Sequence, residues 1–115
     1  MSFEIAPHTS HYSSKLQPIL DTYPNSKTFI LDTIATKTQD FTLKNKIRFL
    51  TPGIRKLKIP LPEYEISASR GLRVIYIIAK QKIRFITIYS KSELNKSKEI
   101  NSLIAVGWKE VFATL

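Results

Sequence analysis

Two runs rich in Ile, Val, Tyr and Phe dominate the hydrophobic pattern of this chain, at residues 71–79 and 83–90. Such runs are typical of β-strands, and the polar residues Lys80 to Lys82 between them predict a tight turn. Strict alternation places Val74, Tyr76 and Ile78 opposite Arg73, Ile75 and Ile77 in the first strand. In the second it places Ile83, Phe85, Thr87, Tyr89 and Lys91 opposite Arg84, Ile86 and Ile88. Both runs are apolar on both faces for most of their length, which predicts central strands of a covered sheet.

A third strand is predicted at Ile54–Ile59, between the breaker Thr51-Pro52-Gly53 and the prolines at 60 and 62. Period-two alternation sets Leu57 and Ile59, with Arg55, on one face and Lys56 and Lys58 on the other. The short apolar segment 3–6, which ends at a proline, fits an opening or edge strand.

Helices are predicted on either side of these strands. The first runs from Thr9 or Ser10 to about Leu20, with Pro18 favouring a short or irregular helix. The second begins at Asn25 or Ser26 and ends near Phe41, although the pattern allows it to continue through Leu43 and Ile47. Its predicted apolar side consists of Phe29, Ile30, Ile34 and Phe41. A closing helix runs from Leu94 to about Ala105, with Gly107 as its stop and an apolar tail after it.

Length and composition narrow the classes of protein. A chain of 115 residues predicts one domain over 1–115, which buries roughly two thirds of its unfolded surface. The absence of cysteine excludes disulfides and zinc-thiolate sites. The longest apolar run, Val74 to Ala79, is far shorter than the ~18 residues that span a bilayer. The start lacks the pattern of a signal peptide, so we expect a cytoplasmic protein that contacts no membrane.

The net charge of +9 is concentrated in the middle of the chain. Residues 44–91 hold twelve Lys or Arg and only two acids, Glu63 and Glu65, which is a net charge of +10. The flanking segments, 1–43 and 92–115, carry −1 and zero. A localised positive field attracts polyanions, so nucleic acid is the leading class of partner.

The candidate chemistry is carried by cations. The two histidines, His8 and His11, lie away from any acidic cluster, which favours structural roles and argues against a metal site. If the three strands are antiparallel neighbours, a spacing of about 5 Å lets cations from different strands converge on one phosphate. These cations are Lys56, Lys58, Arg73 and Lys91. Arginine can stabilise phosphorane charge, and a lysine among cations can have its pKa lowered enough to transfer a proton. The alternative is a solvated basic face without chemistry.

The order of motifs resembles a known family. Lys-Leu-Lys at 56–58, Gly-Leu-Arg-Val-Ile-Tyr at 71–76 and Ile-Tyr-Ser-Lys-Ser-Glu at 88–93 look like the RelE/HigB branch of the RelE/ParE toxins of type II toxin-antitoxin modules. The resemblance covers roughly residues 50–105. It implies a small α+β fold, with an antiparallel twisted sheet of about four strands, N-terminal helices on one face and a C-terminal helix. It also implies metal-independent, cofactor-free cleavage of mRNA in the ribosomal A site, inhibited by a cognate antitoxin.

Carried over by position, the resemblance makes Lys56 or Lys58 the candidate for proton transfer, Arg73 the group that stabilises the scissile phosphate, and Lys91 the lysine that ends the last strand. Further RNA contacts are expected from Arg55, Arg70, Arg84 and Ser92. Ser92 stands where many relatives have arginine, and the following helix has no tyrosine, whereas RelE itself uses one there. Tyr76 and Tyr89 are interpreted as packing residues.

Two other functions fit the same residues. One is a ParE-like inhibitor that binds DNA gyrase without catalysis, although the retained lysines argue against it. The other is a basic module that binds RNA or the ribosome but does not cleave.

Overall fold

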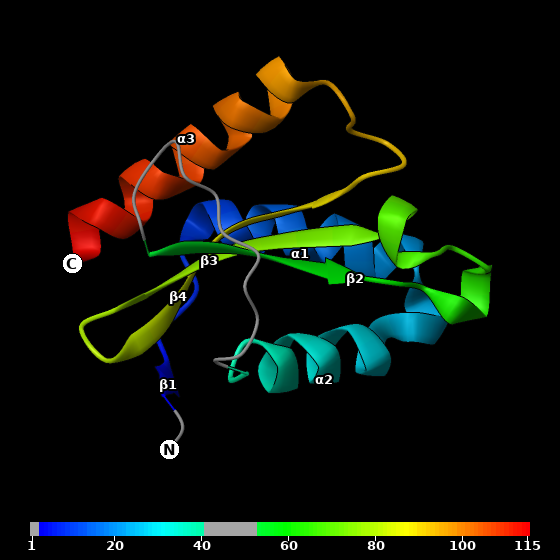
Figure 1. Cartoon of the computed structure of the whole chain (residues 1–115), viewed down its shortest axis with the longest axis horizontal. Helices are drawn as coiled ribbons and strands as arrows, with labels where there is room; N and C mark the ends of the chain where they lie inside the picture. The colour runs from blue at the N-terminus through cyan, green and yellow to red at the C-terminus, as the bar shows by residue number, and fades with distance from the viewer. Residues whose placement is uncertain (1–2, 41–52) are drawn as a thin grey trace.

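The computed structural model describes residues 3–40 and 53–115 (Figure 1). Within these ranges the strands are β1 (Glu4–Ile5), β2 (Ile54–Ile59), β3 (Leu72–Ala79) and β4 (Lys82–Ser90). The α-helices are α1 (Ser10–Thr22), α2 (Lys27–Lys37) and α3 (Ser97–Thr114). Short 3-10 turns occupy Pro24–Ser26, Pro62–Tyr64 and Ala68–Arg70. The predicted α+β class is confirmed.

The strands form one sheet in the order β1-β4-β3-β2. The three long strands are antiparallel, as predicted, and β1 adds a short parallel edge beside β4, so the sheet as a whole is mixed. The predicted turn between β3 and β4 consists of Lys80 and Gln81, which have φ values of 54° and 61°. Positive φ at both central residues is the geometry of a type I′ turn, whose twist matches that of the paired strands.

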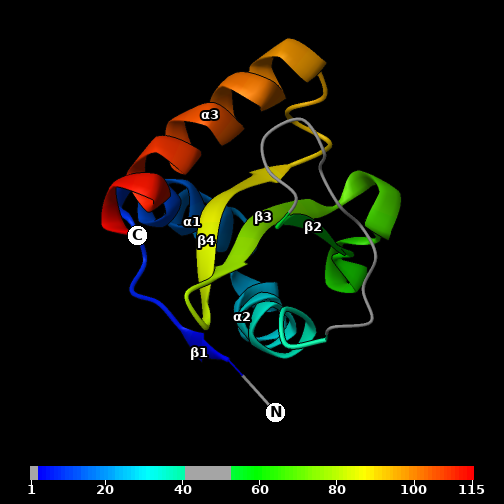
Figure 2. The same ribbon diagram turned by 60° about the vertical axis from the view of Figure 1, so that its left-hand side comes forward.

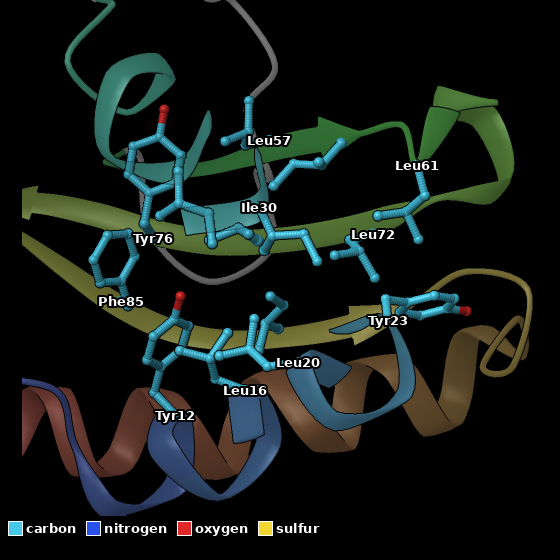
Figure 3. Packing of buried hydrophobic residues seen from close by; sticks show 14 of the residues in the cluster. Tyr12, Leu16, Leu20, Tyr23, Ile30, Leu57, Leu61, Leu72, Tyr76 and Phe85 are labelled. Carbon is cyan, nitrogen blue, oxygen red and sulfur yellow. The ribbon is translucent and has the colours of Figure 1, made fainter. Parts of the chain in front are cut away.

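Helices cover the two faces of the sheet unequally (Figures 1 and 2). On the first, here called the α1/α2 face, Tyr12 and Leu16 of α1 and Ile30 of α2 pack against sheet side chains that include Tyr76 and Phe85 (Figure 3). On the second, the α3 face, one helix packs against a smaller core. Its members from the sheet and α3 are Ile54, Ile75, Ile77, Ile86, Tyr89, Ile104 and Val111. Among the described residues, the α3 face is therefore the one that fewer helices cover.

A β-bulge interrupts the pairing of β3 with β4. Tyr76 lies opposite Phe85, and the next pair along the sheet joins Ile75 to Thr87. Ile86 is the extra residue on β4, with no partner on β3. An extra residue inverts the alternation of side chains beyond it, because the strand period is two.

The bulge corrects the predicted faces of β4. Ile83 and Phe85 lie in the core of the α1/α2 face, as the alternation requires, but Tyr89 packs in the core of the α3 face. The prediction that Ile83, Phe85, Thr87, Tyr89 and Lys91 share one face is wrong for this reason. The inversion turns the end of β4, including Tyr89 and the following Lys91, toward the α3 face.

The first two helices differ from their predicted extents. Helix α1 is capped by Thr9, whose side chain accepts a hydrogen bond from the Tyr12 amide, and it continues through Pro18 to Thr22. Pro18 and Ser14, whose carbonyl loses its helical donor, are both exposed, so water can solvate that carbonyl. Helix α2 ends before the predicted Phe41, which lies outside the described residues. The Thr38 hydroxyl donates to the Ile34 carbonyl at 2.6 Å, a local bond that competes with continuing the helix.

Further corrections concern Phe29 and Gly107. Phe29 was predicted on the apolar side of its helix but is exposed, whereas Ile30 and Ile34 are buried. Gly107 does not stop α3, which begins later than predicted and continues to Thr114. A Cβ atom at Gly107 would lie 2.1 Å from the Ile86 carbonyl oxygen. Glycine is required there because α3 crosses the bulge at backbone contact.

Candidate functional site

Four of the predicted cations lie together on the α3 face: Lys56, Lys58, Arg73 and Lys91. We call them the cation cluster. Lys58 of β2 lies opposite Arg73 of β3, which in turn lies opposite Tyr89 of β4. Lys91 continues the pairing by donating its backbone N–H to the Gly71 carbonyl at 2.9 Å. Within residues 3–40 and 53–115, the three lysines form no ion pair. The cluster is thus a concentration of positive charge that lacks a carboxylate partner in this part of the chain.

Lys56 is the electrostatic centre of the cluster. Burial is the largest cause that lowers its pKa, and the charges of Lys58, Arg73 and Lys91 lower it further. All three neighbours act in the same direction because each disfavours a second positive charge. Lys56 is half-buried, whereas Lys58 on the same strand face is exposed. Lys56 is therefore the better placed of the two lysines predicted for proton transfer.

Arg73 is held in place by the turn that precedes β3. Its side chain is only 5% exposed, and its Nη1 donates to the Ala68 carbonyl at 2.8 Å and to the Leu72 carbonyl at 3.3 Å. Its Nη2 donates to the Ser69 carbonyl at 2.9 Å. Five N–H donors are available on a guanidinium, so Nε and one Nη2 hydrogen are not used by these bonds. Arg73 therefore fixes the 68–70 turn with three of its five N–H donors and leaves two outside these bonds.

Tyr89 packs in the core of the α3 face, as predicted, and it also belongs to this site. It lines a cavity of about 160 Å³ together with Lys56, Lys91 and, from α3, Ser97 and Asn101. Burial raises the pKa of Tyr89, and the charge of Arg73 opposes that shift. The bulge at Ile86 is what turns this residue toward the cluster, and simple alternation gives no sign of it. The hydroxyl is available as a neutral hydrogen-bond donor beside the cations.

The residues predicted to make further RNA contacts separate into two groups. Arg70 and Ser92 lie together, lining a pocket of about 400 Å³ at the end of the sheet where β3 begins and β4 ends. Arg55 is not brought to the cluster: it pairs with Tyr76 and its charge acts on that residue, on the α1/α2 face. Arg84 pairs with Ile77 near the hairpin, roughly 13 Å along β3 from Arg73.

The histidines have structural surroundings. His11 is buried, and its Nε2 lies 2.9 Å from the Thr87 hydroxyl. His8 packs edge-on against the rings of Tyr12 and Phe85. In the described ranges, no group of three or more His, Asp or Glu side chains is arranged to hold a metal ion. None of the helices described is both long and apolar enough to cross a bilayer.

Comparison with protein-family models, curated proteins and solved structures finds no significant match to this chain.

Proposed function

We propose that this protein is a ribosome-dependent mRNA endonuclease of the RelE/HigB type, the toxin of a type II toxin-antitoxin module. The observation that carries the proposal is the cation cluster, in which a half-buried Lys56 lies among Lys58, Arg73 and Lys91. Phosphodiester cleavage by the RNA 2′-hydroxyl needs a proton acceptor, stabilisation of the phosphorane charge and a proton donor for the leaving oxygen.

The residues divide between these tasks. The lowered pKa of Lys56 makes its neutral amine more accessible, so Lys56 is the candidate that deprotonates the 2′-hydroxyl. The remaining donors of Arg73, together with Lys91, stabilise negative charge on the phosphate oxygens. Tyr89 lines the same cavity as Lys56 and Lys91, where its hydroxyl protonates the leaving 5′-oxygen and then recovers a proton from Lys56. The partners are mRNA in the ribosomal A site, the ribosome and an antitoxin that covers the cations, in the cytoplasm.

The hydrogen bonds of Arg73 favour a second candidate function. Three of its hydrogen bonds go to backbone carbonyls, so part of its donor capacity serves the 68–70 turn. A cluster whose arginine is chiefly structural fits a module that binds RNA or the ribosome without cleaving.

Brief induction followed by mapping of new mRNA 5′ ends in translated reading frames separates the two functions. Wild-type protein should produce new ends. Lys56→Ala and Lys56→Arg should both lower cleavage by about a hundredfold or more, because neither supplies a titrating amine there. Lys56→Arg should keep ribosome binding, since the charge is retained.

Lys27 offers the matched control, because it is an exposed lysine on α2, which packs against the opposite face of the sheet. Lys27→Ala and Lys27→Arg should leave cleavage unchanged. Ribosome binding without new 5′ ends in wild type would establish the non-cleaving module. Undiminished cleavage by Lys56→Arg would remove Lys56 from proton transfer.

A further inference from the structure

The pocket beside the cation cluster combines a carboxylate with a guanidinium. It is lined by Glu65, Ile66, Ser67, Arg70 and Ser92 and has a volume of about 400 Å³. Ser92 directly follows Lys91 of the cluster, and the carbonyls of Ala68 and Ser69, which Arg73 holds, belong to the same turn as Arg70. The pocket is thus built onto the phosphate site by chain continuity and by hydrogen bonds.

Glu65 occupies this pocket in an unusual backbone conformation. Its φ and ψ of 56° and 35° are left-handed, a region that non-glycine residues rarely adopt. The Glu65 amide donates to the Pro62 carbonyl at 3.1 Å, and Leu61 and Ile66 close the segment with two backbone hydrogen bonds. A strained position that is fixed by its surroundings is a feature of ligand-binding loops. Glycine would relieve the strain, yet the chain places a carboxylate there.

The hydrogen-bonding capacities of the Glu65 carboxylate and the Arg70 guanidinium together match one nucleobase, guanine. A carboxylate only accepts hydrogen bonds, and guanine presents two adjacent donors, N1–H and N2–H, on its Watson–Crick edge. A guanidinium only donates, and guanine O6 and N7 are acceptors that arginine commonly contacts. The apolar side chain of Ile66 offers packing surface for the ring. Adenine, cytosine and uracil each lack the pair of adjacent donors.

We propose that this pocket binds a guanine base adjacent to the phosphate held by the cation cluster, with Glu65 reading N1–H and N2–H. The inference rests on the proposed function for its RNA substrate. It adds a specificity determinant that the sequence does not indicate, because Glu63 and Glu65 stand out there only as the two acids of the basic segment.

Fluorescence anisotropy with labelled RNA hexamers tests the pocket without ribosomes or cleavage. The probes are oligouridines with guanosine, adenosine or inosine at one internal position, which have equal length and charge. Wild-type protein should bind the guanosine hexamer about fivefold or more tightly than the other two. Inosine differs from guanosine only in lacking the N2 amino group. Weaker binding of the inosine hexamer would therefore show that the pocket contacts N2–H.

Glu65→Gln should abolish the preference for guanosine, because a glutamine cannot accept both hydrogen bonds. Arg70→Gln should weaken the preference for guanosine, because it removes the guanidinium that donates to guanine O6 and N7. Glu63→Gln is the matched control, since it makes the same charge change two residues away, at an exposed position outside the pocket. Thermal unfolding of each variant shows that the fold is retained.

Three results would overturn the inference: equal binding of all hexamers by wild type, no binding of any hexamer, or a guanosine preference that Glu65→Gln retains. Its failure is distinct from that of the proposed function. Cleavage at sites without guanine preference contradicts only the pocket assignment, and guanosine-selective binding without cleavage contradicts only the nuclease.

Discussion

At the scale of single residues, the candidate site depends on a lysine placed where its charge is unfavourable. Lys56 loses hydration and faces three cations, and both effects lower its pKa. Residues poised for proton transfer commonly reduce the stability of the fold that holds them. Sequence alternation correctly assigned Lys56 and Lys58 to one face. It did not show which of the two is more buried, since burial depends on the neighbouring strand and on α3.

Lys56→Met should therefore stabilise the protein while it abolishes cleavage. The gain in free energy of unfolding should be about 0.5 to 1 kcal/mol at neutral pH, measured by chemical denaturation. Because the pKa is lower in the folded state than the ordinary 10.5, the unfolded chain binds more protons and wild-type stability rises with pH in that window. The advantage of methionine should accordingly shrink as the pH approaches 10.5. Lys27→Met, at an exposed position of α2, is the matched control.

At the scale of elements, the bulge in β4 determines which residues meet. Composition and period predicted the three long strands, their turns and the covering helices, because each depends on local pattern. The bulge depends on a single unpaired residue, Ile86, in an unbroken apolar run, and nothing local distinguishes it from its neighbours. Its consequence is large, since it turns Tyr89 and Lys91 toward Arg73.

Gly107→Ala tests the contact between α3 and the bulge. Alanine favours a helix interior over glycine by about 1 kcal/mol, so propensity alone predicts stabilisation. The structure predicts the reverse, because the new Cβ would lie 2.1 Å from the Ile86 carbonyl oxygen. We expect a loss of about 1 to 3 kcal/mol in denaturant titration. Gly53→Ala is the control, since the nearest atoms to its Cβ would belong to the Ile77 side chain, at 3.3 Å and 3.5 Å, and the Ile78 carbonyl oxygen would lie 4.0 Å away.

The hairpin between β3 and β4 provides a second test. Lys80 and Gln81 both have positive φ, which asparagine and glycine adopt more easily. Replacing the pair by Asn-Gly should raise stability by about 1 kcal/mol in thermal unfolding. Cleavage should stay unchanged, because the turn lies at the end of β3 opposite to Arg73. An unchanged or lower melting temperature would contradict the type I′ assignment.

At the scale of the whole molecule, the positive charge that is concentrated in one segment of the sequence contributes to one face of the sheet. Residues 44–91, which carry the excess of positive charge, contain β2, β3 and β4. The α3 face of these strands carries the cation cluster. The charge count predicts an anionic partner, but it does not show which of the cations share one site. Arg55 faces the opposite core and Arg84 lies near the hairpin, because sequence proximity does not fix the face or the row of a side chain.

The salt dependence of RNA binding should report this arrangement. Each phosphate contact to a single strand contributes about 0.7 to the slope of log K against log salt concentration. Lys58→Ala removes one exposed cation of the cluster, so the slope should fall in magnitude by about that amount. Lys27→Ala should leave it unaltered. Equal slopes for both variants would place the RNA elsewhere on the molecule.

The central claim is that the cation cluster promotes attack by the RNA's own 2′-hydroxyl, and a site-specific deoxy substitution tests it most directly. An mRNA bound in the ribosomal A site is incubated with purified protein, either all-ribose or with one 2′-deoxynucleotide at the mapped cleavage position. Only the all-ribose mRNA should be cut, its 5′ fragment should end in a 2′,3′-cyclic phosphate, and Lys56→Arg should suppress the cut. Cleavage of the deoxy-substituted mRNA at the same position, or no cleavage of either, would contradict it.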